Sequence, residues 1–212
     1  MAARFATARF RSPAQSPGST SMRIPVFFAA LFVTGVFCGA VSIVWFPSSL
    51  AEMVARGFDQ AVPLLQNTAS AVTSARTELA FACVLLLIVW LASQLPLLPI
   101  GGLLLTGVCF VRGASVGLCI SELFVQFGWR GAGFDLLALV PWNILTGGGL
   151  VLACSVGYAH ARRLRRLSLR QVEARWWFTF HGAFLFALAL SIAAMWVEGT
   201  LSPPVARLLA LG

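Results

Sequence analysis

Few side chains in this chain of 212 residues have the types and spacing needed for catalysis. The two histidines, His160 and His181, are not part of a nucleophile or metal-ligand motif, and no GxSxG, HExxH or ExxH motif occurs. All 15 basic residues are arginines, so neither a P-loop lysine nor a Schiff-base lysine exists. We therefore expect a protein that is not an enzyme and that holds no cofactor or metal ion.

The five cysteines lie in apolar stretches, and no two of them form a CxxC pair. Free cysteines in such surroundings behave as small apolar packing residues, so we expect neither disulfides nor a metal site. They are Cys38, Cys83, Cys109, Cys119 and Cys154.

Charged residues inside apolar stretches are the stronger candidates. Arg112 stands near the middle of one such stretch, Glu122 near its end and Asp135 at the start of the next. A charge at bilayer depth costs about 2.5–3.5 kcal/mol, so it normally faces the protein interior and finds a partner. Arg112 and Glu122 are too far apart to pair within one straight helix, since ten residues span ~15 Å.

The stretch after Asp135 carries Pro141 and Asn143, followed by three glycines at 147–149. Proline and glycine weaken a helix, and at membrane depth the freed carbonyl groups need donors. We therefore expect a broken helix and a cluster of Arg112, Asn143 and backbone carbonyls. A structural charge is the favoured interpretation of Arg112, and a residue lining an ion or substrate path is the alternative.

The composition indicates which elements hold these residues. Hydrophobic residues make up 59% of the chain, charged residues 10%, and the mean hydropathy is +0.88. Soluble domains average about 45–50% apolar and about 25% charged residues. This composition indicates an integral membrane protein and argues against a soluble enzyme, a disordered chain and a disulfide scaffold.

Apolar stretches predict an all-α polytopic membrane bundle with about five transmembrane helices. We expect residues 24–212 to form a single integral membrane domain and residues 1–23 to be a disordered, basic cytoplasmic arm. The expected spans cover residues 24–46, 79–98, 101–124, 134–158 and 176–197, with a tight turn at 96–102.

Arginine placement predicts the orientation. Two Arg-rich stretches, in residues 4–23 and 162–175, flank expected spans, and cytoplasmic segments carry such an excess of basic residues. With five crossings, both stretches are cytoplasmic only if the N-terminus is inside and the C-terminus outside. We interpret the net charge of +8 as orientation information and not as a nucleic-acid surface.

Residues 47–78 form the expected outer segment, in which apolar residues recur mostly at spacings of three and four. This pattern is typical of an amphipathic helix lying at the membrane surface or on the bundle. Docking of a partner through Met53, Phe58 and Val62 is the more specific hypothesis.

Two pairs of glycines have the GxxxG spacing that allows helices to approach closely, Gly35 with Gly39 and Gly113 with Gly117. We expect them to serve packing within the chain, and a homo-oligomer contact is the alternative.

The stretch 98–155 resembles the stage II sporulation protein M family. The similarity consists of a small/Pro turn into a span, Arg-Gly followed four residues later by Gly, an aromatic-Gly-x-x-Gly turn and a Pro-x-Asn step. The matching residues are Pro99, Gly101, Arg112, Gly113, Gly117, Gly128, Gly131, Pro141 and Asn143. Trp142 and the glycines at 147–149 depart from the family pattern.

The resemblance implies a scaffold of the engulfment machinery in the mother-cell membrane at the sporulation septum. Its implied partners are the stage II D and P proteins, peptidoglycan hydrolases that act outside the membrane. A small transporter or channel subunit that uses Arg112, Asn143 and the broken fourth span is the alternative function.

The orientation is tested with reporters fused to the C-terminus. We expect a C-terminal reporter that works only outside the cytoplasm to be active. The predicted N-terminus is inside, and an odd number of crossings places the C-terminus outside. A reporter active only in the cytoplasm would contradict the predicted topology.

Overall fold

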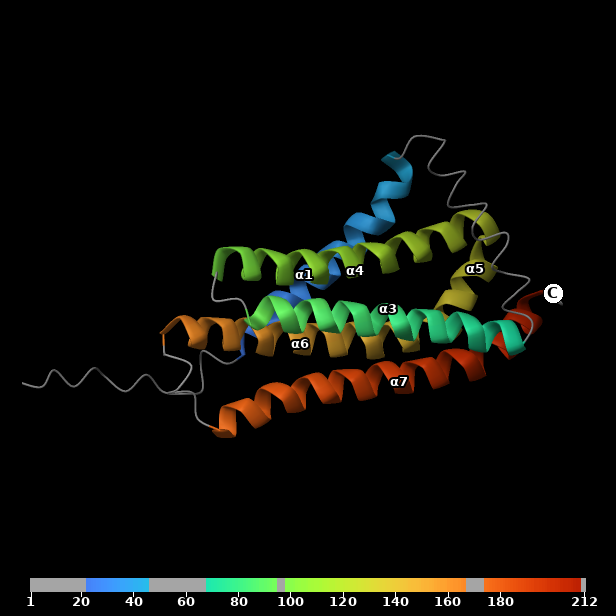
Figure 1. Cartoon of the computed structure of the whole chain (residues 1–212). Coiled ribbons are helices and arrows are strands. Elements are labelled where there is room, and N and C mark those ends of the chain that lie inside the picture. Colours follow the sequence, from blue (N-terminus) through green and yellow to red (C-terminus); the bar gives the residue numbers. More distant parts are fainter. Residues whose placement is uncertain (1–21, 46–67, 95–97, 167–173, 211–212) are drawn as a thin grey trace, which may run out of the picture.

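The computed structural model describes residues 22–45, 68–94, 98–166 and 174–210, and all regular structure in these ranges is helical. The elements are α1 (Arg23–Trp45), α3 (Thr68–Gln94), α4 (Leu98–Phe127), α5 (Trp129–Phe134), the π-helix η1 (Asp135–Leu139), α6 (Val140–Arg166) and α7 (Ala174–Ala210) (Figure 1). The all-α prediction is confirmed for these residues.

Five of these helices, α1, α3, α4, α6 and α7, are long and apolar enough to cross a membrane. Their outward faces carry large apolar side chains such as Phe37, Leu103, Phe178 and Trp196, each at least 67% exposed. Helices that are apolar on the face turned away from the protein are typical of a bundle surrounded by lipid. The chain is a multi-pass membrane protein with five spanning helices, as the sequence predicts.

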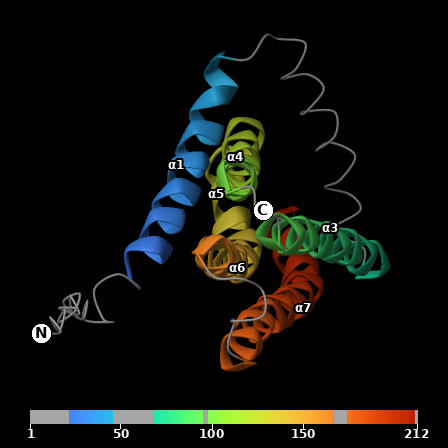
Figure 2. The ribbon, with the colours of Figure 1, turned by 60° about the vertical axis from the view of Figure 1, so that its left-hand side comes forward.

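Helix α6 is the centre of the bundle. Of its apolar segment 56% is buried, against 17–28% in the other four helices, and it packs on α1, α3, α4 and α7. Figure 2 looks nearly along α3, α4 and α6 and shows α6 between the other helices.

The glycines at 147–149 lie inside the unbroken α6, so the prediction that they break the span is wrong. Two of them allow neighbouring helices to come close instead. A Cβ atom at Gly147 would lie 2.7 Å from the ring of Phe32 on α1, and one at Gly149 would lie 3.3 Å from the carbonyl oxygen of Ala187 on α7. The surrounding helices supply the packing energy that offsets the low helix propensity of glycine.

The two glycine pairs bring α1 and α4 together. A Cβ atom at Gly113 or Gly117 would fall on the carbonyl oxygen of Phe32 or Val36 of α1, and Gly35 and Gly39 meet α4 backbone in the same way. Such direct backbone contact is the geometry that small residues permit between membrane helices. The expectation that these glycines pack helices within the chain agrees with this geometry.

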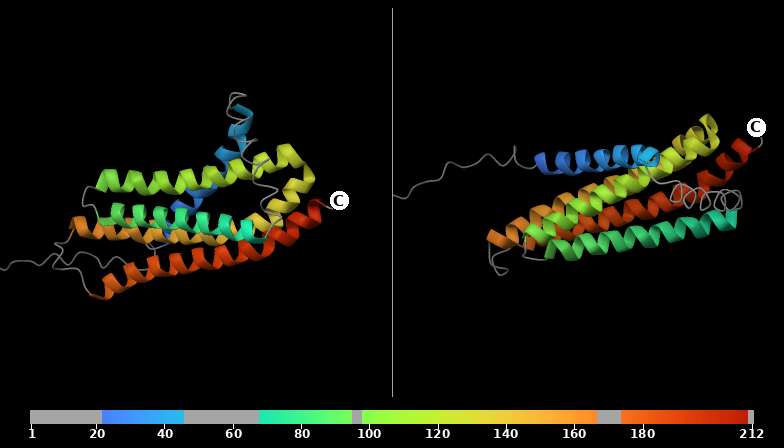
Figure 3. Two further views of the ribbon diagram at one scale, coloured as in Figure 1. Left: turned by 45° about the vertical axis from the view of Figure 1, so that its right-hand side comes forward. Right: turned by 90° about the horizontal axis from the view of Figure 1, so that it is seen from above.

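A sharp turn joins α4 to α5. Gly128 has a φ of 58°, the left-handed conformation that glycine adopts without strain. A Cβ atom at Gly131 would fall on the carbonyl oxygen of Leu123, so α5 folds back tightly against α4. Figure 3 shows α5 linking the ends of α4 and α6.

The irregularity expected near Pro141 is a π-helical turn that precedes the proline. The Val140 N–H donates to the carbonyl of Asp135, five residues back. Proline cannot donate a hydrogen bond and its ring crowds the carbonyl four residues back, and a wider turn accommodates both effects. The helix continues through Pro141 and does not unwind.

Several predicted boundaries are wrong. The fourth apolar segment ends at Arg165 instead of residue 158, and the fifth ends at Val205 instead of residue 197. Residues 68–78, assigned to the outer segment, belong to α3, and residues 98–102, assigned to a turn, belong to α4. Pro99 is the second residue of α4, where a missing N–H costs no helical hydrogen bond. The predicted docking residues Met53, Phe58 and Val62, and residues 1–21 of the predicted arm, lie outside the described residues.

The described arginines of the two Arg-rich stretches include Arg23 of α1 and Arg162 and Arg165 of α6, and these three line one pocket at one end of the bundle. We call this end the basic end. The described C-terminal part of α7 lies at the opposite end (Figure 1). That the basic end faces the cytoplasm remains a prediction.

Gly117→Ala should destabilise the fold, because the added methyl group falls on the backbone of α1. We expect a loss of about 1–3 kcal/mol, typical of overpacking, measured by unfolding in detergent micelles. Gly107→Ala on the same helix is the matched control, since no described atom lies within 4 Å of its added Cβ atom. Equal stability of the two variants would contradict a tight contact between α1 and α4.

Candidate functional site: a buried charge cluster

The four acidic residues of the described ranges lie along one part of the bundle, beside Arg112 or beside Cys119 on the same helix. Each carboxylate acts electrostatically on Arg112 or on Cys119, two turns further along α4. They come from α3, α4, η1 and α7 and are Glu78, Glu122, Asp135 and Glu198. We call Arg112 and these four residues the Arg112 cluster.

Glu78 is the ion-pair partner of Arg112. Its Oε2 atom lies 3.9 Å from Nη1 of Arg112, a distance for an ion pair but too long for a hydrogen bond. The Arg112 side chain is only 11% exposed. A buried guanidinium needs such compensation, because leaving water costs several kcal/mol per ion.

Aromatic rings enclose the other faces of the guanidinium. The Cζ atom of Arg112 lies 5.0 Å from the ring centroid of Trp142 on α6 and 5.8 Å from that of Phe81 on α3. Both distances are within the range of a cation–π interaction, which strengthens where water is excluded. Arg112 therefore links α4 to α3 and α6.

The predicted contact between Arg112 and Asn143 does not form. Oδ1 of Asn143 is buried and has no hydrogen-bond partner among the described residues. The neighbouring Trp142 faces Arg112 instead, and consecutive residues point about 100° apart around a helix. The prediction identified the correct part of α6 but the wrong side chain.

Glu198 and Asp135 are buried acids with unused oxygen atoms. They are 4% and 5% exposed, and one carboxylate oxygen of each has no hydrogen-bond partner within the described ranges. Glu122 is 3% exposed. These unpartnered oxygens can take up a proton, and within the described ranges no three His, Cys, Asp or Glu side chains are placed together to hold a metal ion.

The cavity beside Arg112 is small. The cavity there has a volume of about 10 Å³, no larger than one water molecule requires. It is lined by Ala82, Leu85, Leu86, Arg112, Thr146, Leu150 and Ser191. This geometry favours the structural interpretation of Arg112 over that of a residue lining an open path.

Glu78 and Glu198 were missed as site residues by the sequence analysis, although a signal for them existed. All four acids of the cluster lie within two residues of a predicted span end on the same side of the membrane. The sequence predicts water at those ends, whereas α3 and α7 continue past them; Glu198 is buried there, and the Glu78 side chain is 39% exposed.

His160, at the opposite end of α6, is fully buried. Its Nδ1 atom accepts a hydrogen bond of 2.9 Å from Nε1 of Trp176, and its ring stacks on Phe180 with centroids 4.0 Å apart. These contacts join α6 to α7 and have the geometry of a packing cluster.

Comparison of the chain with models of known protein families, with curated proteins and with solved structures found no match in any of the three.

A double-mutant cycle tests the ion pair. Arg112→Gln should lower the free energy of unfolding by about 1–3 kcal/mol, because it removes the ion pair with Glu78, whose side chain is 39% exposed, and the cation–π contacts of the guanidinium. Adding Glu78→Gln should recover part of this loss, measured by unfolding in mixed micelles.

Arg76→Gln, at an exposed position of α3, is the control for removing one positive charge. Additive effects of Arg112→Gln and Glu78→Gln would show that the two side chains do not interact.

Proposed function

We propose that this protein is a membrane scaffold that anchors and localises peptidoglycan-degrading partners, as its resemblance to the stage II sporulation protein M family implies. Its multi-pass helical fold suits a protein that holds others at a membrane. The proposed location is the cell membrane, specifically the mother-cell membrane at the sporulation septum.

One observation carries the proposal: residues of the resemblance shape the backbone or pack helices. Gly113 and Gly117 contact α1, Gly128 makes the turn after α4, Gly131 lets α5 fold back, and Pro141 follows the π-helical turn. A motif used in this way specifies the form of the bundle, which is what a scaffold has to preserve.

The Arg112 cluster supports the same conclusion. Its ion pair and cation–π contacts connect α3, α4 and α6 around a cavity of about 10 Å³. Such a cross-linked interior resists rearrangement and gives partners a fixed surface. The proposed partners are the stage II D- and P-type hydrolases, docked through the part of the predicted outer segment that precedes α3, residues 47–67.

Affinity purification from sporulating membranes tests this function. We expect the tagged chain to recover a peptidoglycan hydrolase, and Phe58→Ser with Val62→Ser to reduce recovery at least fivefold. Arg56→Ser with Asp59→Ser, off the apolar pattern of the same segment, is the matched control. Recovery that is unchanged by the Phe58 and Val62 variants, at equal membrane levels, would rule out docking at this segment. Absence of any hydrolase would contradict the scaffold role.

The excess of buried acid over base favours a second candidate, a small transporter or channel subunit. Glu198 and Asp135 have carboxylate oxygens that a transported proton or cation could occupy. Flux of protons or cations in proteoliposomes that is lost in Glu198→Gln and kept in Gly107→Ala would support this candidate over the scaffold.

A further inference from the structure

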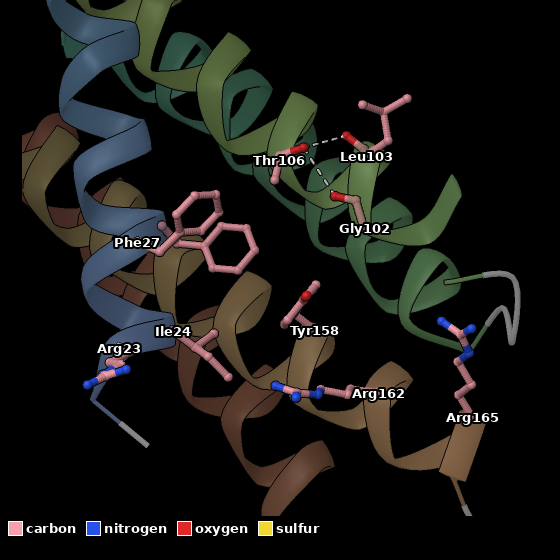
Figure 4. A pocket seen from close by; sticks show the side chains of 10 residues that line it. Arg23, Ile24, Phe27, Gly102, Leu103, Thr106, Tyr158, Arg162 and Arg165 are labelled. Carbon is pink, nitrogen blue, oxygen red and sulfur yellow. Dashed lines mark hydrogen bonds between the residues drawn. The ribbon is translucent and has the colours of Figure 1, made fainter. Parts of the chain in front are cut away.

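A pocket at the basic end of the bundle has no part in the function proposed above. It has a volume of about 750 Å³ and lies between α1, α4 and α6 (Figure 4). It is lined by Arg23, Ile24, Phe27, Phe28, Gly102, Leu103, Thr106, Tyr158, Arg162 and Arg165. We call it the basic pocket.

One part of the basic pocket is cationic. Arg23 comes from α1, and Arg162 and Arg165 come from consecutive positions on one face of α6. Figure 4 shows the Arg162 side chain reaching from α6 toward α1. Within the described ranges, none of these three guanidinium groups has a carboxylate partner, so their donors remain open to an anion.

The other part is apolar and open to the surroundings. Ile24 and Phe27 of α1 and Leu103 of α4 contribute to it, and Phe27 and Leu103 are 54% and 73% exposed. In a membrane such exposed faces contact acyl chains. The pocket is therefore amphipathic, with cations at one side and a lipid-facing apolar wall at the other.

The depth of the pocket matches the headgroup region. Arg23 is the first residue of the apolar segment of α1, and Arg165 is the last residue of that of α6. Arginines at the ends of spanning helices lie at the membrane–water boundary, where lipid phosphates lie. Basic pockets between transmembrane helices at this level suit anionic lipid headgroups.

We propose that the basic pocket binds one anionic phospholipid, whose headgroup phosphate is held by Arg162, while Arg23 and Arg165 at the two sides of the pocket add positive charge (Figure 4). One acyl chain lies along Phe27 and Leu103. The Arg162 guanidinium supplies charge-assisted hydrogen bonds to the phosphate oxygens, and the Tyr158 hydroxyl at the pocket wall is a further donor.

The structure also supplies a control for diffuse positive charge. Arg163 lies between Arg162 and Arg165 in sequence but does not line the pocket, and its Cζ atom stacks over the Trp176 ring at 4.1 Å. Removing its charge changes the net charge of the basic end without changing the pocket.

Lipid titration of the purified full chain, read by native mass spectrometry, tests the proposal. We expect the wild-type chain to bind one dioleoyl-phosphatidylglycerol at least tenfold more tightly than dioleoyl-phosphatidylcholine. Arg162→Gln with Arg165→Gln should weaken that binding about 30-fold, since each guanidinium at a membrane surface contributes about a factor of five. Arg163→Gln should change it less than twofold.

Gly102→Leu is a second variant that fills the pocket and leaves every charge in place. A Cβ atom at Gly102 would lie 3.6 Å from the Tyr158 ring, an ordinary contact, so the longer side chain occupies space at the pocket wall. We expect it to reduce phosphatidylglycerol binding even if the double arginine variant does not fold.

Three results would overturn the proposal. If Arg163→Gln weakened phosphatidylglycerol binding as much as the double arginine variant, the attraction would be diffuse electrostatics. If Gly102→Leu left phosphatidylglycerol binding unchanged, the lipid would bind elsewhere. Displacement of the lipid by millimolar inorganic phosphate would identify a site for the free anion. None of these results depends on whether the chain recovers a hydrolase, so the lipid site and the scaffold role are tested separately.

Discussion

A guanidinium group halfway along a membrane-spanning helix imposes a condition on the helices around it. Arg112 cannot leave its charge in hydrocarbon, and its own helix offers no acid within reach, so its partners come from other helices. Helix α3 supplies Glu78 and Phe81, and α6 supplies Trp142. The carboxyl group of Glu198 on α7 also interacts electrostatically with Arg112. The positions of α3, α6 and α7 relative to α4 are thus linked to one charge.

The close packing of the helices meets a second requirement of a lipid environment, which is that helices must associate without a hydrophobic driving force. Helices in lipid gain little from burying apolar surface against each other, so contact distance governs their association. Glycines of α1 and α4 place backbone against backbone, and glycines of α6 accept Phe32 of α1 and the backbone of α7. The central position of α6 depends on these small residues as much as the Arg112 cluster depends on its acids. Both sets of contacts favour a bundle with one stable arrangement.

Charge is distributed unevenly along the bundle axis. The Arg112 cluster meets α6 near Trp142, and the basic pocket meets the same helix at Arg162, twenty residues and ~30 Å away. The arginines that line the basic pocket orient a membrane protein, since anionic lipid headgroups attract the basic end. In the functions proposed above, the lipid fixes the basic end while the opposite side presents the outer segment to hydrolases. A scaffold needs both a defined orientation and a rigid body.

The sequence alone determined the number of spans and the approximate place of each, because apolar length is a local property set by bilayer thickness. It also identified Arg112 as a buried charge and the glycine pairs as contact points, because both signals reside in single residues or short spacings. Tertiary structure decided what each of them meets. Glu78 instead of Asn143 pairs with Arg112, and the glycines at 147–149 pack a central helix instead of breaking it. Partners across helices depend on the rotation and depth of each helix, and these are set by contacts between residues far apart in the chain.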